Sequence, residues 1–296
     1  MADTKVREVA KVITAHKQRE GGGFIVRRPF PTLGLQLVDP FLLLDEMGPV
    51  RYAPGEAVGA PDHPHRGFET VTYMLDGEFQ HEDSAGHRGR LRAGDVQWMT
   101  AGAGIVHSEE PSQAIRDNGG RIHGFQIWIN LPAKLKLTRP RYQEIPGDRI
   151  PQAATPDGQA RVRVVAGEAL GARAVIDTHT PIVYQDWSLD AGGDVTVPVP
   201  RAQQALVYVF QGSVRVGDGG DAVRDGQLAL LEAGDAVRLR GGDGGGRLLL
   251  LAGVPLGEPV ARYGPFVMNS EAEIVQAVND FRSGKMGEIT RTAEVG

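Results

Sequence analysis

The sequence predicts an all-β protein built from two tandem barrels, with one short helix near the C-terminus. Three observations support this prediction. The apolar stretches are short and rich in Val, Ile, Leu and Tyr, the 40 glycines and 19 prolines among 296 residues supply many turns, and the two halves share a repeated pattern. The chain is also long enough for two sizeable hydrophobic cores.

Each predicted strand is an apolar run bounded by Gly, Pro, Asp or Asn, as in antiparallel strands joined by turns. The main runs lie at residues 24–26, 70–75, 96–100, 124–130, 162–166, 205–210, 227–231 and 247–252. One segment has a helical period instead. Ser270 and Glu273 have the spacing of a capping box, and apolar residues then recur at helical intervals as far as Phe281, before Gly284. We therefore expect one amphipathic helix here, with a packing role.

Two short motifs of the first half recur in the second. The segment 71–77 (VTYMLDG) is echoed by 206–212 (LVYVFQG), and 91–96 (LRAGDV) by 231–237 (LEAGDAV). Both motifs recur about one domain length later, which indicates an internal duplication. A stretch rich in proline and charge separates the halves, and the predicted domains are therefore residues 1–140 and 141–296.

Composition excludes several classes of protein. The 32 basic and 37 acidic residues give a formal net charge of −5, which argues against direct nucleic-acid binding. We interpret the one basic cluster, Lys134, Lys136, Arg139 and Arg141, as a solvated connector. The absence of cysteine excludes disulfides, Cys-ligated metals and a thiol nucleophile. The polar N-terminus and the lack of long apolar runs predict a cytoplasmic protein that does not enter membranes.

Two pairs of potential metal ligands stand out. His63 and His65 are two residues apart, and so are His107 and Glu109. Because residues two apart on a strand face the same side, each pair can point into one barrel, and Pro64 favours the extended backbone that this requires. Three imidazoles and one carboxylate suit a first-row transition metal and leave coordination positions open for a substrate or dioxygen.

Other residues compete for a place in this site. Glu69 is the main rival of Glu109 as the acidic ligand, and Gln126 and Glu69 are candidates for contacting the ligands. His81 and His87 fall in the turn region between the two motifs, where we expect a surface role. His123 opens an alternating segment that includes Gln126, and for Gln126 core packing is an equal alternative to contacting the ligands. His16 and His179 have no spacing argument.

At this point the motifs resemble those of a known family. The segments 63–73 (HPHRGFETVTY), 94–102 (GDVQWMTAG) and 104–109 (GIVHSE) are similar to those of the pirins, two-domain members of the cupin superfamily. The tail from 263–269 (YGPFVMN) to 284–287 (GKMG) also resembles the end of a pirin. The resemblance covers nearly the whole chain.

This resemblance implies a bicupin, that is, two cupin-type β-barrels, with one metal in the N-terminal barrel. It implies that His63, His65, His107 and Glu109 hold the metal, and it favours Glu109 over Glu69. The metal is usually iron, as Fe(II), although nickel, copper, manganese, cobalt or zinc can occupy such sites. The second barrel has VPVPRA at 197–202 where a His-x-His pair would fall, so we expect it to hold no metal.

The family implies two kinds of activity. One is quercetin 2,3-dioxygenase activity, in which a flavonol ring is opened by O2 and carbon monoxide is released. We expect this activity, with Glu109 as the base that takes the proton of the flavonol hydroxyl, and with Phe68, Met99 or Trp128 as pocket walls. The alternative is an iron-dependent, redox-sensing regulator that acts through protein partners.

Overall fold

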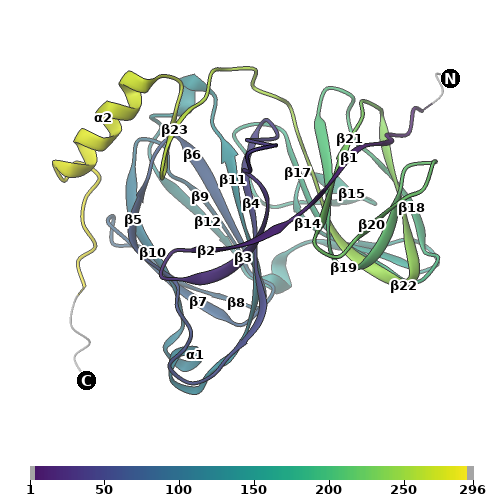
Figure 1. The fold of residues 1–296 in the computed structure, drawn as a ribbon, viewed down its shortest axis with the longest axis horizontal. Helices are drawn as coiled ribbons and strands as arrows, with labels where there is room; N and C mark the ends of the chain where they lie inside the picture. The colour runs from purple at the N-terminus through teal and green to yellow at the C-terminus, as the bar shows by residue number, and fades with distance from the viewer. Residues whose placement is uncertain (1–3, 292–296) are drawn as a thin grey trace. The chain divides into compact units, whose positions relative to one another are not determined.

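The computed structural model describes residues 4–291, and strands predominate in it (Figure 1). The all-β prediction is confirmed, because every run predicted above lies within a strand. Two runs coincide with whole strands, β9 (Val96–Thr100) and β21 (Gln227–Leu231). The α-helices of the described residues are α1 (Gln113–Asn118), which was not predicted, and α2 (Glu271–Arg282). Neither has the length and apolar character that a membrane span requires.

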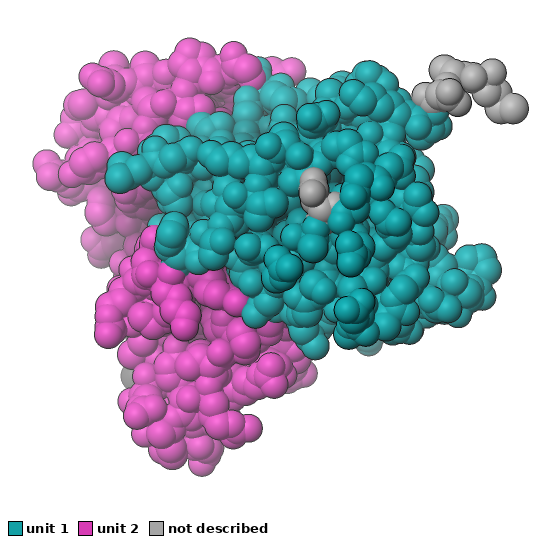
Figure 2. All heavy atoms as spheres, turned by 45° about the vertical axis from the view of Figure 1, so that its right-hand side comes forward, with its two compact units in different colours: residues 1–16, 28–40, 148–256 teal, residues 17–27, 41–147, 257–296 magenta. Residues whose placement is uncertain are grey.

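The chain folds into two compact units that interleave along the sequence (Figure 2). Unit 1 holds residues up to 16, 28–40 and 148–256, and unit 2 holds 17–27, 41–147 and 257 onward. These units differ from the predicted consecutive domains 1–140 and 141–296 because strand pairing overrides chain order. For example, β1 (Val9–Thr14) pairs with β21 of unit 1, and β12 (Arg141–Ile145) pairs with β9 of unit 2.

Unit 2 contains a four-stranded antiparallel sheet and most of a seven-stranded sheet. The smaller sheet has the order β5 (Ala60–His65), β10 (Ile105–Pro111), β7 (Glu78–Asp83), β8 (Arg88–Arg92). The larger sheet has the order β12, β9, β6 (Phe68–Asp76), β11 (Gly120–Asn130), β4 (Phe41–Tyr52), β3 (Phe24–Phe30), β2 (His16–Glu20). Short elements complete the unit: β23 (Ala261–Tyr263), β24 (Phe266–Met268) and the 3₁₀ helices η1 (Ala133–Leu135) and η2 (Gly147–Arg149).

Unit 1 is built on a single nine-stranded antiparallel sheet. Its main path is β1, β21, β19 (Gln204–Val216), β22 (Ala236–Gly253), β17 (Ile182–Leu189), β14 (Ala160–Ala166), β13 (Gln152–Ala154). Beside this path, β18 (Asp194–Pro198) pairs with β22 and β20 (Asp221–Arg224) with β19, while β15 (Glu168–Ala169) and β16 (Ala172–Arg173) form a separate ribbon. A large cluster of buried Val, Leu and Ala surrounds Trp187, so this sheet encloses its own core.

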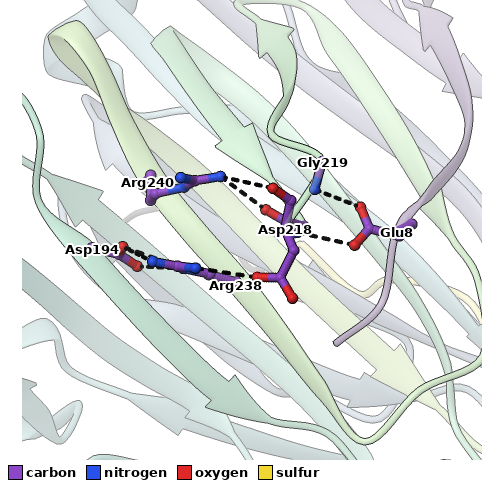
Figure 3. A network of polar contacts seen from close by, with 7 residues as sticks. Glu8, Asp194, Asp218, Gly219, Arg238 and Arg240 are labelled. Atoms are coloured by element: carbon purple, nitrogen blue, oxygen red, sulfur yellow. Dashed lines mark hydrogen bonds and ion pairs between the residues drawn. The ribbon is translucent and has the colours of Figure 1, made fainter. Parts of the chain in front are cut away.

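Within unit 1, a polar network joins Glu8 to the turn at residues 218–219 (Figure 3). The Glu8 carboxylate accepts hydrogen bonds from the backbone N–H groups of Asp218 and Gly219, at 3.0 and 3.2 Å. Arg238 bridges the side chains of Asp194 and Asp218. The Glu8 contacts, together with the pairing of β1 with β21, hold the start of the chain against the second half of the sequence.

Helix α2 begins with the predicted capping box. The Ser270 hydroxyl donates to the Glu273 carboxylate at 2.9 Å and accepts from the backbone N–H of Glu273 at 3.4 Å. Ile274 and Ala277 are buried in a cluster that also contains Val106 of β10, whereas Val275 is exposed. The helix therefore covers the outer side of the strand that carries His107.

An ion pair ties this helix to the strand that carries the first two histidines. Arg66 directly follows His65, and its Nη1 lies 2.9 Å from Oδ2 of Asp280 on α2. Hydrogen bonds from Lys285 and Arg66 lower the pKa of Asp280 to about 2. Both members of the pair are largely buried.

We expect Asp280→Asn to lower the melting temperature at pH 7, because Arg66 loses its charged partner. Since the folded pKa is below the unfolded value of about 3.9, the stabilisation is present above about pH 4 and is lost as the pH falls through 2. The difference in melting temperature between the wild type and the variant should therefore be smaller at pH 3 than at pH 7. Asp148→Asn, at an exposed position, is the control; an equal effect of both variants at both pH values would contradict the prediction.

Candidate metal centre

Strand register brings the three predicted histidines together in unit 2. β5 and β10 run antiparallel, and His63 is paired directly with His107. His65 lies one pleat further along β5 and therefore faces the same side. One potential ligand atom from each ring lies within 4.8 Å of the others. Pro64 lies in the extended strand, as its fixed φ angle favours.

The ring nitrogens of this cluster have the properties of metal ligands. Nε2 of His63 and Nε2 of His65 are 3.0 Å apart. Among residues 4–291, neither ring nitrogen of the buried His107 has a hydrogen-bond partner. Burial, followed by the charge of His63, lowers the pKa of both rings well below the usual value, so they are neutral at pH 7. Neutral imidazoles fit a first-row divalent metal.

Glu109 lies on the same face of β10 as His107, and the opposite sheet holds its carboxylate. The Thr72 hydroxyl donates to Oε1 at 2.7 Å, and the Gln126 amide donates to Oε2 at 2.9 Å. Thr72 and Gln126 are paired residues on β6 and β11. The expected contact of Gln126 with the predicted ligands is therefore present, while ligation by Glu109 stays a prediction.

The contacts of Glu109 belong to two facing rows of polar side chains. On the small sheet, cross-strand pairing aligns Glu109 and His81, and the backbone of Gly89 lies next to His81. On the large sheet it aligns Glu144, Gln97, Thr72 and Gln126 on β12, β9, β6 and β11. His81 contacts Glu144 just as Glu109 contacts Thr72 and Gln126. Desolvation alone would raise the pKa of Glu144. Hydrogen bonds from His81 and Gln97 outweigh desolvation and lower this pKa to about 2.

Glu69 lies away from this interior. On β6 the side chains of Glu69 and Thr72 point to opposite faces, because successive residues of a strand alternate. Its carboxylate accepts a 2.6 Å hydrogen bond from Thr100. Glu69 therefore points to the other face of β6 from Thr72, and a contact of Glu69 with the ligands stays a prediction. His123 is also separate, since its Nε2 lies 2.8 Å from the Glu46 carboxylate.

Aromatic side chains lie beside the histidines. The ring centroids of Phe68 and Trp128 are each 5.1 Å from that of His65. The guanidinium of Arg262 lies over the Trp128 ring, 4.8 Å from its centroid. Met99 is fully buried in a cluster with Tyr142. Of the three predicted wall residues, Phe68 and Trp128 therefore pack beside the histidine cluster.

Two expectations about solvated residues are wrong. His81 is 1% exposed rather than on the surface. The alternation of Phe79, His81 and Asp83 with Glu78, Gln80 and Glu82 was the signal that could have predicted its burial.

Lys136 is also 1% exposed, and its Nζ donates to the Gly67 and Val267 carbonyls and to Asn130 Oδ1. Lys136 belongs to the basic cluster that we interpreted as a solvated connector. Its hydrogen bonds instead link the turn after His65 to β24.

The Thr72 hydrogen bond gives a testable prediction. Thr72→Val removes the hydroxyl that holds Glu109 Oε1 and leaves a side chain of similar shape. We expect metal affinity to fall by about 10- to 100-fold, as for other groups that orient metal ligands. Competition with a fluorescent chelator measures this. Thr100→Val is a matched control, because it removes an equivalent bond to Glu69; an equal loss in both variants would contradict the prediction.

Comparisons with known proteins agree with this architecture. The family model named Pirin matches residues 23–129, and the model of the pirin C-terminal cupin domain matches residues 184–287. A pirin-like protein of Solanum lycopersicum is 43% identical over 286 residues, which cover 96% of this chain and 94% of the relative.

Solved structures agree as well. A quercetin 2,3-dioxygenase of Acinetobacter baumannii is 40% identical, with a TM-score of 0.90 and coverage of 97% of this chain and 100% of that one. A bacterial pirin of Escherichia coli in complex with nickel(II) is 21% identical and shares the fold, with a TM-score of 0.65 and coverage of 83% and 99%. With both halves matched and two barrels in the fold, the chain belongs to the pirin family of bicupins.

Proposed function

We propose that this protein is a metal-dependent dioxygenase of the quercetin 2,3-dioxygenase type, which cleaves a flavonol with O2 and releases carbon monoxide. The main support is the convergence of three buried or half-buried histidines, among which both ring nitrogens of His107 lack a protein partner within residues 4–291. The 40% identity to the quercetin 2,3-dioxygenase of Acinetobacter baumannii supports the reaction class.

The proposed ligands are His63, His65, His107 and Glu109, and the proposed metal is Fe(II), with nickel, copper, manganese, cobalt or zinc as substitutes. When bound, the metal would act as a Lewis acid for the flavonol oxygen and as the centre that engages O2. The neutral state of the two buried rings favours binding of a cation, since no proton has to be displaced.

Side chains of this unit would prepare the substrate. Glu109 would accept the proton of the flavonol 3-hydroxyl, because a carboxylate that already accepts from Thr72 and Gln126 still has lone pairs free. The rings of Phe68 and Trp128 offer flat apolar surfaces for a planar flavonol. Burial of Phe68, Thr72 and Glu109 would exclude water from the reacting atoms.

Aerobic loss of quercetin absorbance, with carbon monoxide detection, tests the proposal. Protein reconstituted with ferrous iron is compared with chelator-treated protein and with a His63→Ala variant. We expect turnover only in the first sample. No turnover by protein with one equivalent of iron bound would overturn the proposal, and a pull-down with and without iron would then test metal-dependent binding of protein partners.

A further inference from the structure

A second group of potential metal ligands lies in unit 2 and shares no residue with the first. It consists of His81 on β7, His87 in the turn between β7 and β8, and Glu144 on β12. One ligand atom from each residue lies within 4.8 Å of the others, as in the first cluster. Within residues 4–291, two groups of three potential ligands converge in this way, the first cluster and this one.

The Nε2 atoms of both histidines lie near the same oxygen, Oε1 of Glu144. This oxygen contacts Nε2 of His81 directly and lies 3.4 Å from Nε2 of His87. A separation of 3.4 Å is long for a hydrogen bond. It matches the spacing of two donors around a tetrahedral zinc ion, which is about 3.3–3.6 Å for bonds of about 2.0–2.2 Å. The shorter contact between His81 and Glu144 would have to open to the same spacing to admit the ion.

The surrounding chain holds the two rings in place. The Tyr142 ring packs against both, with centroids 5.4 Å from His81 and 4.8 Å from His87. Asp83 Oδ1 accepts hydrogen bonds from the backbone N–H groups of Ala85 and His87, both at 2.8 Å, and so shapes the turn that presents His87. The Gln97 amide donates to Oε1 of Glu144 at 2.8 Å.

Gly89 lets the backbone of β8 pass close to the donors. A Cβ at this position would lie 2.3 Å from Nε2 of His81 and 2.6 Å from Oε1 of Glu144. The cluster is also open to solvent, because the side chains of His87 and Glu144 are 42% and 32% exposed while that of His81 is fully buried. An ion can therefore reach a buried donor through two partly exposed ones.

We propose that Nε2 of His81, Nε2 of His87 and Oε1 of Glu144 form a second site for a first-row divalent cation such as Zn²⁺ or Co²⁺. Two imidazoles and one carboxylate are a common donor set for zinc, and the remaining position is left for water. On binding, the ion replaces the proton between His81 and Glu144, and that proton passes to solvent.

Metal stoichiometry of the full-length, tag-free protein tests this site independently of enzymatic activity. Equilibrium dialysis against Co²⁺, with metal analysis and the visible spectrum of bound cobalt, is expected to give two equivalents for the wild type. His87→Ala and Glu144→Gln should each bind one equivalent, and so should Gly89→Ala, whose added methyl group displaces the donors. His107→Ala should also bind one, and the double variant with His87→Ala none.

His16→Ala is the matched control, because this exposed histidine belongs to neither cluster, and it should retain two equivalents. Far-UV circular dichroism verifies that each variant folds. One equivalent in the wild type, or two equivalents that survive both His87→Ala and Glu144→Gln, would overturn the proposal. If flavonol turnover failed but two cobalt equivalents were bound as described, the second site would stand without the dioxygenase activity.

Discussion

Glu109→Gln is expected to lower kcat for flavonol turnover by about 10²- to 10⁴-fold, the usual contribution of a positioned base. The amide keeps the shape of the side chain but cannot take the proton of the flavonol 3-hydroxyl. Because His63, His65 and His107 are unchanged, part of the bound metal should remain. Steady-state kinetics on iron-loaded protein, normalised to iron content, measure the effect.

Glu69→Gln is the control that separates the two acidic candidates. Its carboxylate accepts a hydrogen bond from Thr100 on the opposite face of β6, so the variant should keep its normalised kcat. A larger loss of kcat in Glu69→Gln than in Glu109→Gln would reverse the assignment. Full activity of Glu109→Gln would show that the base is another group.

Trp187→Ala is expected to have the largest effect on stability. The ring is fully buried among the Val and Leu side chains of unit 1, and its Nε1 donates to Gln185 at 2.8 Å. Truncating a buried tryptophan typically lowers the free energy of unfolding by about 3–5 kcal/mol, because packing is lost and a cavity is left. Urea unfolding followed by far-UV circular dichroism measures this change.

The control for this variant is Val175→Ala, because Val175 is 54% exposed and should lose little on truncation. Metal content offers a second readout. The proposed ligands all belong to unit 2, so folded Trp187→Ala protein should bind the same number of metal equivalents as the wild type. Equal stability of both variants would mean that the core of unit 1 does not depend on this ring.

The elements themselves were predictable because local patterns determine them. Runs of β-branched and aromatic residues between turn residues located the strands, and β9 and β21 were predicted to the residue. The Ser270 and Glu273 pair located the start of α2, since both capping partners lie within one turn. The spacing of His63 with His65, and of His107 with Glu109, likewise predicted which side chains share a face.

Strand faces were not predictable where both sides of a strand are buried. On β6, residues 68–74 are all buried, so apolar and polar positions do not alternate and Glu69 could not be placed. On β7, alternation does exist, and it places His81 with Phe79 on the inner face. The misplacement of His81 therefore came from treating the segment as a turn.

The sequence by itself determined the fold class, the repeated halves, the capped helix and the two pairs of predicted metal ligands, because these depend on neighbours along the chain. Tertiary structure alone decided which strands pair, and with them the non-consecutive units and the burial of Lys136. It also decided that Glu109 meets Thr72 and Gln126 while His81 meets Glu144. The physical reason is register: a cross-strand contact depends on the alignment of residues far apart in the chain, and no local pattern encodes that alignment.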